Sequence, residues 1–231
     1  MSSPYSSTAG TNDPIPSIQE PVIHFTPPGS KPDGLSYEEH VKNFWQHIIP
    51  IPKNNNPWYD GTGANCANGQ PGKNSSVFYL SGNGGGVTSR ICRVPAGKRL
   101  LIPIMVVEIS DKEVPNASVA QLGDRAKKDQ DSVTSLYLRI GNKVYGHGDL
   151  SKYRVHTEPF DVEFPNNGIF GVMKGGPSKA VADGFYIITE PIEEGTYTIH
   201  YKSSLSCSGE NCIDLNHDQD VTYTIIAEKI H

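Results

Sequence analysis

Apolar residues along this chain occur in short runs that alternate with polar residues, between clusters of Gly, Pro, Asn and Asp. Alternation with a period of two is typical of strands with one buried face. It is clearest near the end of the chain, where Val221, Tyr223, Ile225 and Ala227 share one face of a predicted strand over residues 220–228. Further strands are predicted at residues 76–80, 99–107, 133–140, 143–145, 159–164, 168–172, 184–189 and 196–202. Repeated hairpins of this kind predict a mainly β fold, an antiparallel β-sandwich or jelly roll with one or two short helices.

Two segments show helical spacing instead. Ser36 and Glu39 form a capping-box pattern ahead of an apolar stripe that ends before Pro50. Ser118 and Gln121 repeat the capping pattern ahead of a second, mostly polar helix, which we expect to lie on the surface.

The composition suits one β domain with an N-terminal extension. Residues 1–34 are rich in Ser, Thr, Pro and Gly and contain few large apolar side chains, which predicts an extended or disordered arm. Residues 35–231 contain enough apolar material for a single β-sandwich domain, cut into short runs by 23 Gly and 18 Pro in the whole chain. Pro103 lies inside a predicted strand and indicates a bulge or a sheet edge there.

The charge balance restricts the partners. There are 20 Lys and Arg against 25 Asp and Glu, a net charge of −5, and no basic stripe, which argues against a nucleic-acid partner. The longest apolar run, residues 100–107, is too short to span a membrane. No apolar signal segment follows Met1, so we expect either a cytosolic protein or a mature secreted domain with an added Met.

The cysteines favour the secreted or cell-surface alternative. Cys66, Cys92, Cys207 and Cys212 are even in number, and three pairings are open in principle. We favour Cys66–Cys92 and Cys207–Cys212 as disulfides over free thiols or a zinc site, because neither cluster has the spacing of a zinc knuckle.

Several stretches are similar to an uncharacterised family of predicted secreted proteins of archaea and soil bacteria. The resemblance covers most of the chain after residue 36. It is carried by the Trp-containing helix before Pro50 and by residues 51–52, 56–57, 60–66, 69–70, 77–82, 90–98, 183–186, 195–200 and 220–225. The resemblance implies an extracytoplasmic location and brings no reaction, cofactor or catalytic residue.

One candidate site would bind a divalent transition metal. His147 and Asp149, and likewise His156 and Glu158, are spaced i, i+2, so that in extended chain both side chains of a pair project to the same side. Two such pairs on adjacent strands would offer two imidazoles and two carboxylates to the metal, and metal-bound water could act as a nucleophile. The alternative is a polar hairpin with surface histidines.

A second candidate site would bind calcium. Asp214, Asn216, Asp218 and Asp220 place oxygen ligands at alternate positions, as at the start of an EF-hand loop. The loop lacks the glycine at the sixth position and the glutamate at the twelfth, so a solvated acidic turn is the alternative.

A third candidate is a ligand-binding site made by aromatic side chains. Trp58 and Tyr59 lie in an Asn-rich loop beside Asp60, and such rings can stack on a sugar while Asp or Asn accepts hydrogen bonds from its hydroxyls. The competing explanation is core packing. For acid–base catalysis, Glu108, Asp183 and Glu190 could converge in the fold, whereas no Gly-x-Ser-x-Gly elbow marks a serine nucleophile.

From the sequence we therefore expect an extracellular or cell-surface module that binds a glycan or a surface protein, or assembles into a homo-oligomer. The alternative is a metal-dependent secreted enzyme that acts on polysaccharide or a related polymer.

Overall fold

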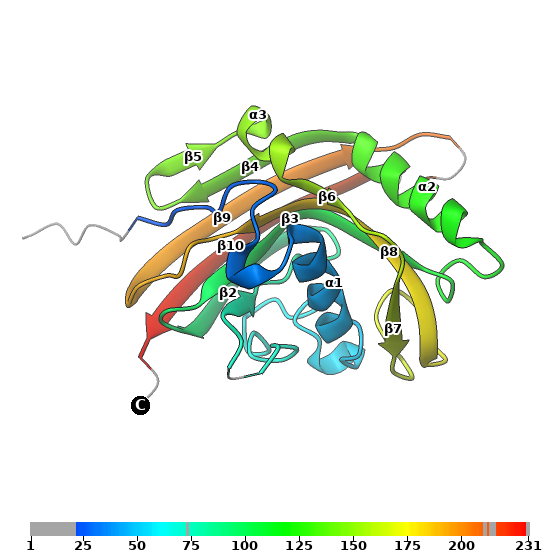
Figure 1. Ribbon diagram of the computed structural model, residues 1–231, viewed down its shortest axis with the longest axis horizontal. Coiled ribbons are helices and arrows are strands. Elements are labelled where there is room, and N and C mark those ends of the chain that lie inside the picture. Colours follow the sequence, from blue (N-terminus) through cyan, green and yellow to red (C-terminus); the bar gives the residue numbers. More distant parts are fainter. Residues whose placement is uncertain (1–21, 73, 210–211, 213–215, 230–231) are drawn as a thin grey trace, which may run out of the picture.

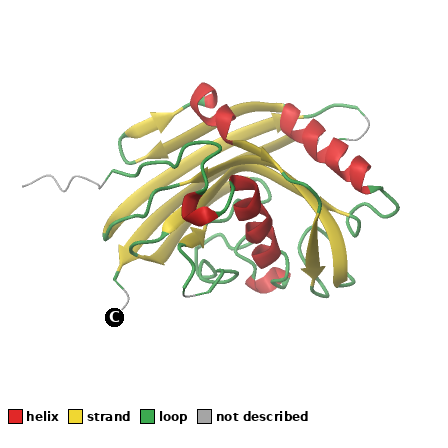
Figure 2. Ribbon diagram, in the orientation of Figure 1, coloured by secondary structure: helices red, strands yellow, loops and turns green. Residues whose placement is uncertain are grey.

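The computed structural model describes residues 22–72, 74–209, 212 and 216–229. These residues form two sheets of five strands each (Figures 1 and 2). The first, called the β3 sheet here, has the order β1-β3-β8-β6, and β7 also pairs with β8. Its strands are β1 (Val77–Tyr79), β3 (Arg99–Ser110), β6 (Arg154–His156), β7 (Phe160–Phe164) and β8 (Gly176–Ile188).

The second sheet, called the β10 sheet, has the order β2-β10-β9-β4-β5. Its strands are β2 (Gly86–Pro95), β4 (Val133–Ile140), β5 (Lys143–Tyr145), β9 (Gly195–Ser206) and β10 (Asn216–Glu228). The predicted mainly β, sandwich-like fold is therefore confirmed.

Each sheet also contains one parallel pair, β1 with β3 and β2 with β10, which makes both sheets mixed. The hairpin pattern of the sequence predicts antiparallel neighbours, because consecutive strands joined by tight turns must run in opposite directions. Strands β2 and β10 are far apart in the chain, so no turn fixes their relative direction.

Helix α1 (Tyr37–Ile48) begins at the predicted capping box. The Ser36 hydroxyl accepts a hydrogen bond from the Glu39 backbone N–H at 3.2 Å, and the Glu39 carboxylate accepts one from the Ser36 N–H at 2.7 Å. The apolar face of α1 packs on β6, β7 and β8 and buries Phe44 and Trp45.

Helix α2 (Val119–Asp131) also begins at its predicted capping box. It packs on β3 and β8, where Leu122 and Ala126 join Ile109 and Val181 in a small separate cluster. The remaining helical pieces are short: α3 (His147–Leu150) and the 3-10 turns η1 (Pro32–Gly34), η2 (Lys53–Asn55) and η3 (Ser151–Tyr153).

Strand β3 has a free edge that matters for the candidate site. The predicted irregularity at Pro103 is present as a register shift against β8 between Pro103 and Met105. On its other side β3 pairs with β1 only at residues 99–101. Within the described part of the chain, no strand pairs with β3 on that side beyond Leu101.

The predicted strand at residues 168–172 is wrong. This segment is a turn in which Phe170 has φ of +55° and Gly171 has φ of +78°, values that extended chain does not adopt. The apolar pattern misled the prediction because Ile169 and Val172 are buried by packing of the turn itself.

Part of the predicted N-terminal arm is packed on the domain. Residues 1–21 lie outside the described residues, but Ile23 and Thr26 are buried. The Thr26 N–H donates to the Ile188 carbonyl at 2.9 Å, and Phe25 forms a bridge with Thr189 at the end of β8. The packed structure therefore begins before residue 34.

One large hydrophobic core joins both sheets and α1, next to the small cluster under α2. The two predicted disulfides, Cys66–Cys92 and Cys207–Cys212, are both formed and confirm the predicted pairing. Two disulfides are typical of proteins from an oxidising compartment.

Candidate functional site

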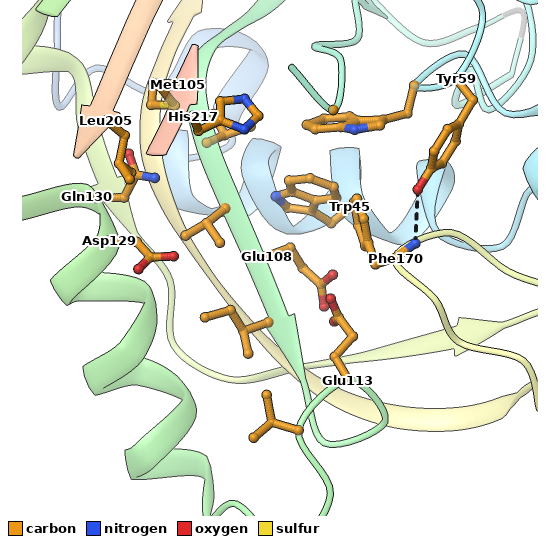
Figure 3. Close-up of a pocket in the computed structure, with 16 residues that line it drawn as sticks. Trp45, Tyr59, Met105, Glu108, Glu113, Asp129, Gln130, Phe170, Leu205 and His217 are labelled. Atoms are coloured by element: carbon orange, nitrogen blue, oxygen red, sulfur yellow. Dashed lines mark hydrogen bonds between the residues drawn. The ribbon is translucent and has the colours of Figure 1, made fainter. Parts of the chain in front are cut away.

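A pocket of about 370 Å³ runs along the free edge of β3, between α2 and the loop that follows η2 (Figure 3). Its size lies at the lower end of the range for small-molecule sites. Residues Met105 to Ile109 of β3 line it together with Gln130 and Asp129 from the last turn of α2. Leu205 of β9 and His217 of β10 close it from the other sheet. We call it the β3 pocket.

One wall of the β3 pocket is aromatic. Trp45 comes from α1, Trp58 and Tyr59 from the loop after η2, and Phe170 from the turn after β7. The ring centroids of Trp45 and Trp58 lie 5.5 Å apart, and Phe170 meets the Trp58 ring edge to face at 5.7 Å. At the rim, the Tyr59 hydroxyl accepts a hydrogen bond from the Phe170 N–H at 3.2 Å. Tyr59 is 44% exposed, so a ligand would meet its ring first.

Hydrogen bonds hold the aromatic loop in place. The Asn56 side chain donates to the Ile48 carbonyl at 2.8 Å, at the end of α1, and accepts from the Trp58 N–H at 2.9 Å. This buried amide therefore fixes the loop that carries Trp58 against the helix that carries Trp45.

Arg90 fixes the same loop to the β10 sheet. Its side chain is buried and donates to the carbonyls of Asp60 at 2.6 Å and Ser81 at 2.7 Å, and to the Tyr223 hydroxyl at 2.6 Å. The Cys66–Cys92 disulfide ties a later point of the loop to β2, two residues from Arg90. The aromatic wall is thus built on a firmly anchored loop.

An acidic pair lies beside the aromatic wall. Glu108 projects from β3 and Glu113 from the turn after it, and Figure 3 shows their carboxyl groups pointing toward one another. Glu108 is 4% exposed, and neither of its oxygens receives a hydrogen bond from an N–H or hydroxyl of the described residues. Glu113 accepts bonds from the Ser110 N–H at 2.9 Å and the Ser110 hydroxyl at 2.5 Å.

The pair holds a proton more strongly than ordinary carboxyls do. Burial, followed by the repulsion of Glu113, raises the pKa of Glu108 well above its usual range. Burial raises the pKa of Glu113 to about 7, against the opposing effect of the Ser110 hydrogen bonds. Two carboxyls in contact cannot both ionise without strong repulsion, so after the first ionises, near pH 7, they share the remaining proton. That proton gives Glu108 its one available partner, the Glu113 carboxyl.

The predicted aromatic residues divide between the pocket and the loop. Trp58 and Tyr59 line the β3 pocket, and their role in ligand binding stays a prediction. Asp60 does not line it; its carboxylate accepts bonds from the Thr62 N–H, the Thr62 hydroxyl and the Asn65 N–H, each at 2.8 Å. Asp60 therefore shapes the loop.

The structure does not bring together the four residues predicted to bind a transition metal. His147 and Asp149 lie in α3, where Asp149 accepts a bond from the Gly146 N–H, and not in the predicted extended strand. His156 on β6 pairs with the buried Asp183 at 3.1 Å, and Glu158 is exposed. No three of these ligand atoms come within 4.8 Å of one another in the described residues. The short helix is the physical reason, because it removes the strand geometry that the i, i+2 spacing assumes.

The predicted calcium ligands also lie differently. Asp214 is outside the described residues, whereas Asn216, Asp218 and Asp220 lie in β10 and not in a loop. Asp220 is engaged by His200 and Lys202, each at 2.7 Å. In a strand, alternate side chains stay parallel and do not converge on one ion, unlike those of a calcium loop.

One cluster of potential ligand atoms occurs among the described residues, formed by Asp129, Cys207 and Cys212. The two sulfurs are joined in a disulfide and so are not thiolate ligands.

The sequence analysis identified one of the two residues of the acidic pair. Glu108 was a candidate for acid–base chemistry, but Asp183 lies with Arg154 and His156, and Glu190 pairs with Arg99. Glu113 was missed. The available signal was a carboxyl inside the apolar run of β3, which needs a nearby partner for a proton or a charge.

Comparison with known protein families, with curated proteins and with solved structures found no match. The resemblance to predicted secreted proteins therefore stays a prediction. None of the described helices is long and apolar enough to cross a membrane.

Proposed function

We propose that the chain is an extracellular binding module that holds a small organic ligand in the β3 pocket. The observation that carries this proposal is the buried Glu108 carboxyl, whose oxygens receive no hydrogen bond from an N–H or hydroxyl of the described residues and which lines an aromatic-walled cavity beside Glu113. Buried carboxyls in proteins nearly always have N–H, hydroxyl or cationic partners, so one that lines a cavity and faces only another carboxyl is a natural place for a ligand.

The walls suit an end group of a glycan or a molecule of similar size. Aromatic rings pack on apolar ring faces, and a carboxyl pair with one proton can both donate and accept hydrogen bonds. Secretion is part of the proposal, since the two disulfides favour an oxidising compartment. The metal-dependent enzyme has less support, because its four proposed ligands are dispersed. A surface-protein partner and a homo-oligomer stay predictions.

Intrinsic fluorescence provides the test, because the chain has two tryptophans and both line the pocket. The protein would be titrated with glucose, N-acetylglucosamine, glucosamine, benzyl alcohol and benzylamine. We expect a saturable change with at least one probe, with a dissociation constant of about 1 mM or lower for molecules of this size.

A blocking variant and a matched control make the test specific to this pocket. Gly84 lines the pocket, and a Cβ there would meet only Trp58 Nε1 at 3.9 Å, so Gly84→Leu should fold and obstruct the cavity. Gly61→Leu makes the same change where a Cβ meets nothing within 4 Å. We expect Gly84→Leu to weaken binding about tenfold or more and Gly61→Leu to leave it unchanged. Absence of saturable binding by every probe, or equal binding by Gly84→Leu, would overturn the proposal.

A further inference from the structure

The ionisable groups that line the β3 pocket are mostly acidic. Its lining includes the carboxyls Glu108, Glu113 and Asp129, together with His217, but no Lys or Arg. The chain as a whole is also acidic, with a net charge of −5. An anionic ligand would therefore meet repulsion here, and a cation would meet attraction.

Two further features of the pocket favour a cation. The aromatic wall of Trp45, Trp58 and Phe170 presents π systems, whose faces attract ammonium groups. Asp129 and Gln130 belong to the last turn of α2, and the C-terminal end of a helix carries partial negative charge. Aromatic faces, a helix C-terminus and carboxyls thus converge on one cavity.

The chemistry of Glu108 points the same way. A buried carboxyl without an N–H or hydroxyl donor can be satisfied by a proton from its neighbour or by a donor that a ligand brings. An ammonium group is such a donor, and its charge also removes the repulsion that prevents both carboxyls from ionising.

We infer that the β3 pocket selects a positively charged organic ligand, an organic amine or an amino sugar, and that its binding expels the proton shared by Glu108 and Glu113. This inference rests on the proposed function and specifies its ligand class. In the balanced step, the singly protonated pair and R–NH₃⁺ combine into a complex of two carboxylates with R–NH₃⁺, and one H⁺ leaves to solvent. No covalent bond to carbon forms or breaks.

Other titratable groups face the pair and must be considered in any pH dependence. They are Tyr59 at the rim, Asp129 on α2, His217 on β10 and Tyr186 on β8. Burial raises the pKa of Tyr186 well above its usual range, so this phenol stays neutral through the relevant pH range. Variants of the acidic pair therefore have to show that the released proton comes from the pair and not from Asp129 or His217.

Matched probes test the charge selectivity. Benzylamine carries an ammonium group where benzyl alcohol carries a neutral hydroxyl. In the same way, glucosamine carries an amine that can be charged, whereas the nitrogen of N-acetylglucosamine is acetylated and neutral. At pH 8, where the pair holds one proton, we expect benzylamine to bind at least about tenfold more tightly than benzyl alcohol, measured by tryptophan fluorescence. The two sugars distinguish an amino sugar from another organic amine as the ligand, because tighter binding of glucosamine than of benzylamine would indicate an amino sugar.

Calorimetry tests the proton release. Titrations with benzylamine at pH 8, where the pair holds one proton, in two buffers of different ionisation enthalpy should give close to one proton released for each ligand bound. Glu108→Gln should abolish this release, because the remaining acid, Glu113, has a pKa of about 7 and is already ionised at pH 8. The double variant Glu108→Gln/Glu113→Gln should in addition weaken benzylamine about tenfold or more and leave benzyl alcohol unchanged.

The double variant Asp161→Asn/Glu163→Gln provides the control, because it removes two exposed carboxylates of β7 and should retain both affinity and proton release. Equal binding of benzylamine and benzyl alcohol would overturn the inference while the proposed function stands. Proton release that persists in Glu108→Gln would also overturn it. If no probe binds at all, the proposed function fails together with the inference.

Discussion

At the scale of single residues, two buried ionisable side chains, Arg90 and Glu108, differ in their hydrogen bonding. Arg90 is 1% exposed, and its guanidinium donates to main-chain carbonyls and to a tyrosine hydroxyl at distances as short as 2.6 Å. Glu108 is 4% exposed and receives no such bonds from the described residues. Arg90 therefore stabilises the loop it touches, whereas Glu108 is a cost to stability that a structural role does not explain.

This difference predicts a pH dependence of stability. The pKa of both Glu108 and Glu113 is raised in the folded protein, so the pair contributes stability below about pH 4.5, the ordinary range of an unfolded glutamate. This contribution is lost as pH rises above that range, through about 7 for Glu113. Glu108→Gln removes the buried acid and lets its amide donate to Glu113. We expect the variant to be more stable than the wild type at pH 8, by about 1–3 kcal/mol, and to lose that advantage near pH 5.

Urea unfolding at several pH values measures this effect. Asp161→Asn changes a carboxylate that is exposed on β7 and should follow the wild-type curve. If the unfolding free energies of Glu108→Gln and the wild type stay parallel from pH 5 to pH 8, Glu108 is not a buried acid that titrates in this range.

At the scale of elements, the pocket depends on a loop that has little regular structure of its own. Residues 56–72 connect η2 to β1 through turns, yet they carry Trp58 and Tyr59. The Cys66–Cys92 disulfide, the Asn56 amide and the Arg90 side chain replace the strand pairing that would otherwise fix such a segment. An anchored loop beside the free edge of β3 leaves a cavity where a further strand would have filled the space.

The two disulfides should differ in their effect on stability. Cys66 and Cys92 are 26 residues apart, whereas Cys207 and Cys212 are 5 apart. Because a crosslink that closes a longer loop restricts the unfolded chain more, replacing the first pair by alanine should cost about 3.5 kcal/mol and the second about 2 kcal/mol. Chemical denaturation of Cys66→Ala/Cys92→Ala and Cys207→Ala/Cys212→Ala gives both values, and the reverse ranking would show that loop closure is not the main effect.

At the scale of the whole molecule, one core joins both sheets and α1. Trp45 and Trp58 belong to it, as do Tyr197 and Tyr223 from the β10 sheet. Side chains from the two sheets also meet through hydrogen bonds, since the Ser203 hydroxyl on β9 donates to the Ile104 carbonyl on β3 at 2.8 Å. Apart from the small cluster between α2 and the β3 sheet, the described residues form no separate core that would support independent folding of either sheet.

We therefore expect one cooperative unfolding transition for the domain. Tryptophan fluorescence reports the pocket region, and far-ultraviolet circular dichroism reports the strands of both sheets, so the two urea curves should coincide. Separate midpoints for the two signals would show that the β10 sheet and the pocket region unfold independently.

The sequence by itself determined the local features of this protein. The capping boxes at Ser36 and Ser118, the bulge at Pro103 and the alternating strands β4, β5 and β10 follow from propensities and periodicities that act over a few residues. Cysteine spacing was similarly enough to predict both disulfides.

Only the tertiary structure decided the parallel strand pairs, the free edge of β3 and the candidate site. The pocket is made by Trp45, Trp58, Glu108, Asp129 and Phe170, which come from five separate segments. The spacing of residues along the chain does not encode which distant segments meet, because that depends on how all the apolar faces are buried together. For the same reason the two His–carboxylate pairs predicted to bind a metal do not come together in the structure. Glu108 and Glu113 face one another across a turn that no local sequence pattern predicted.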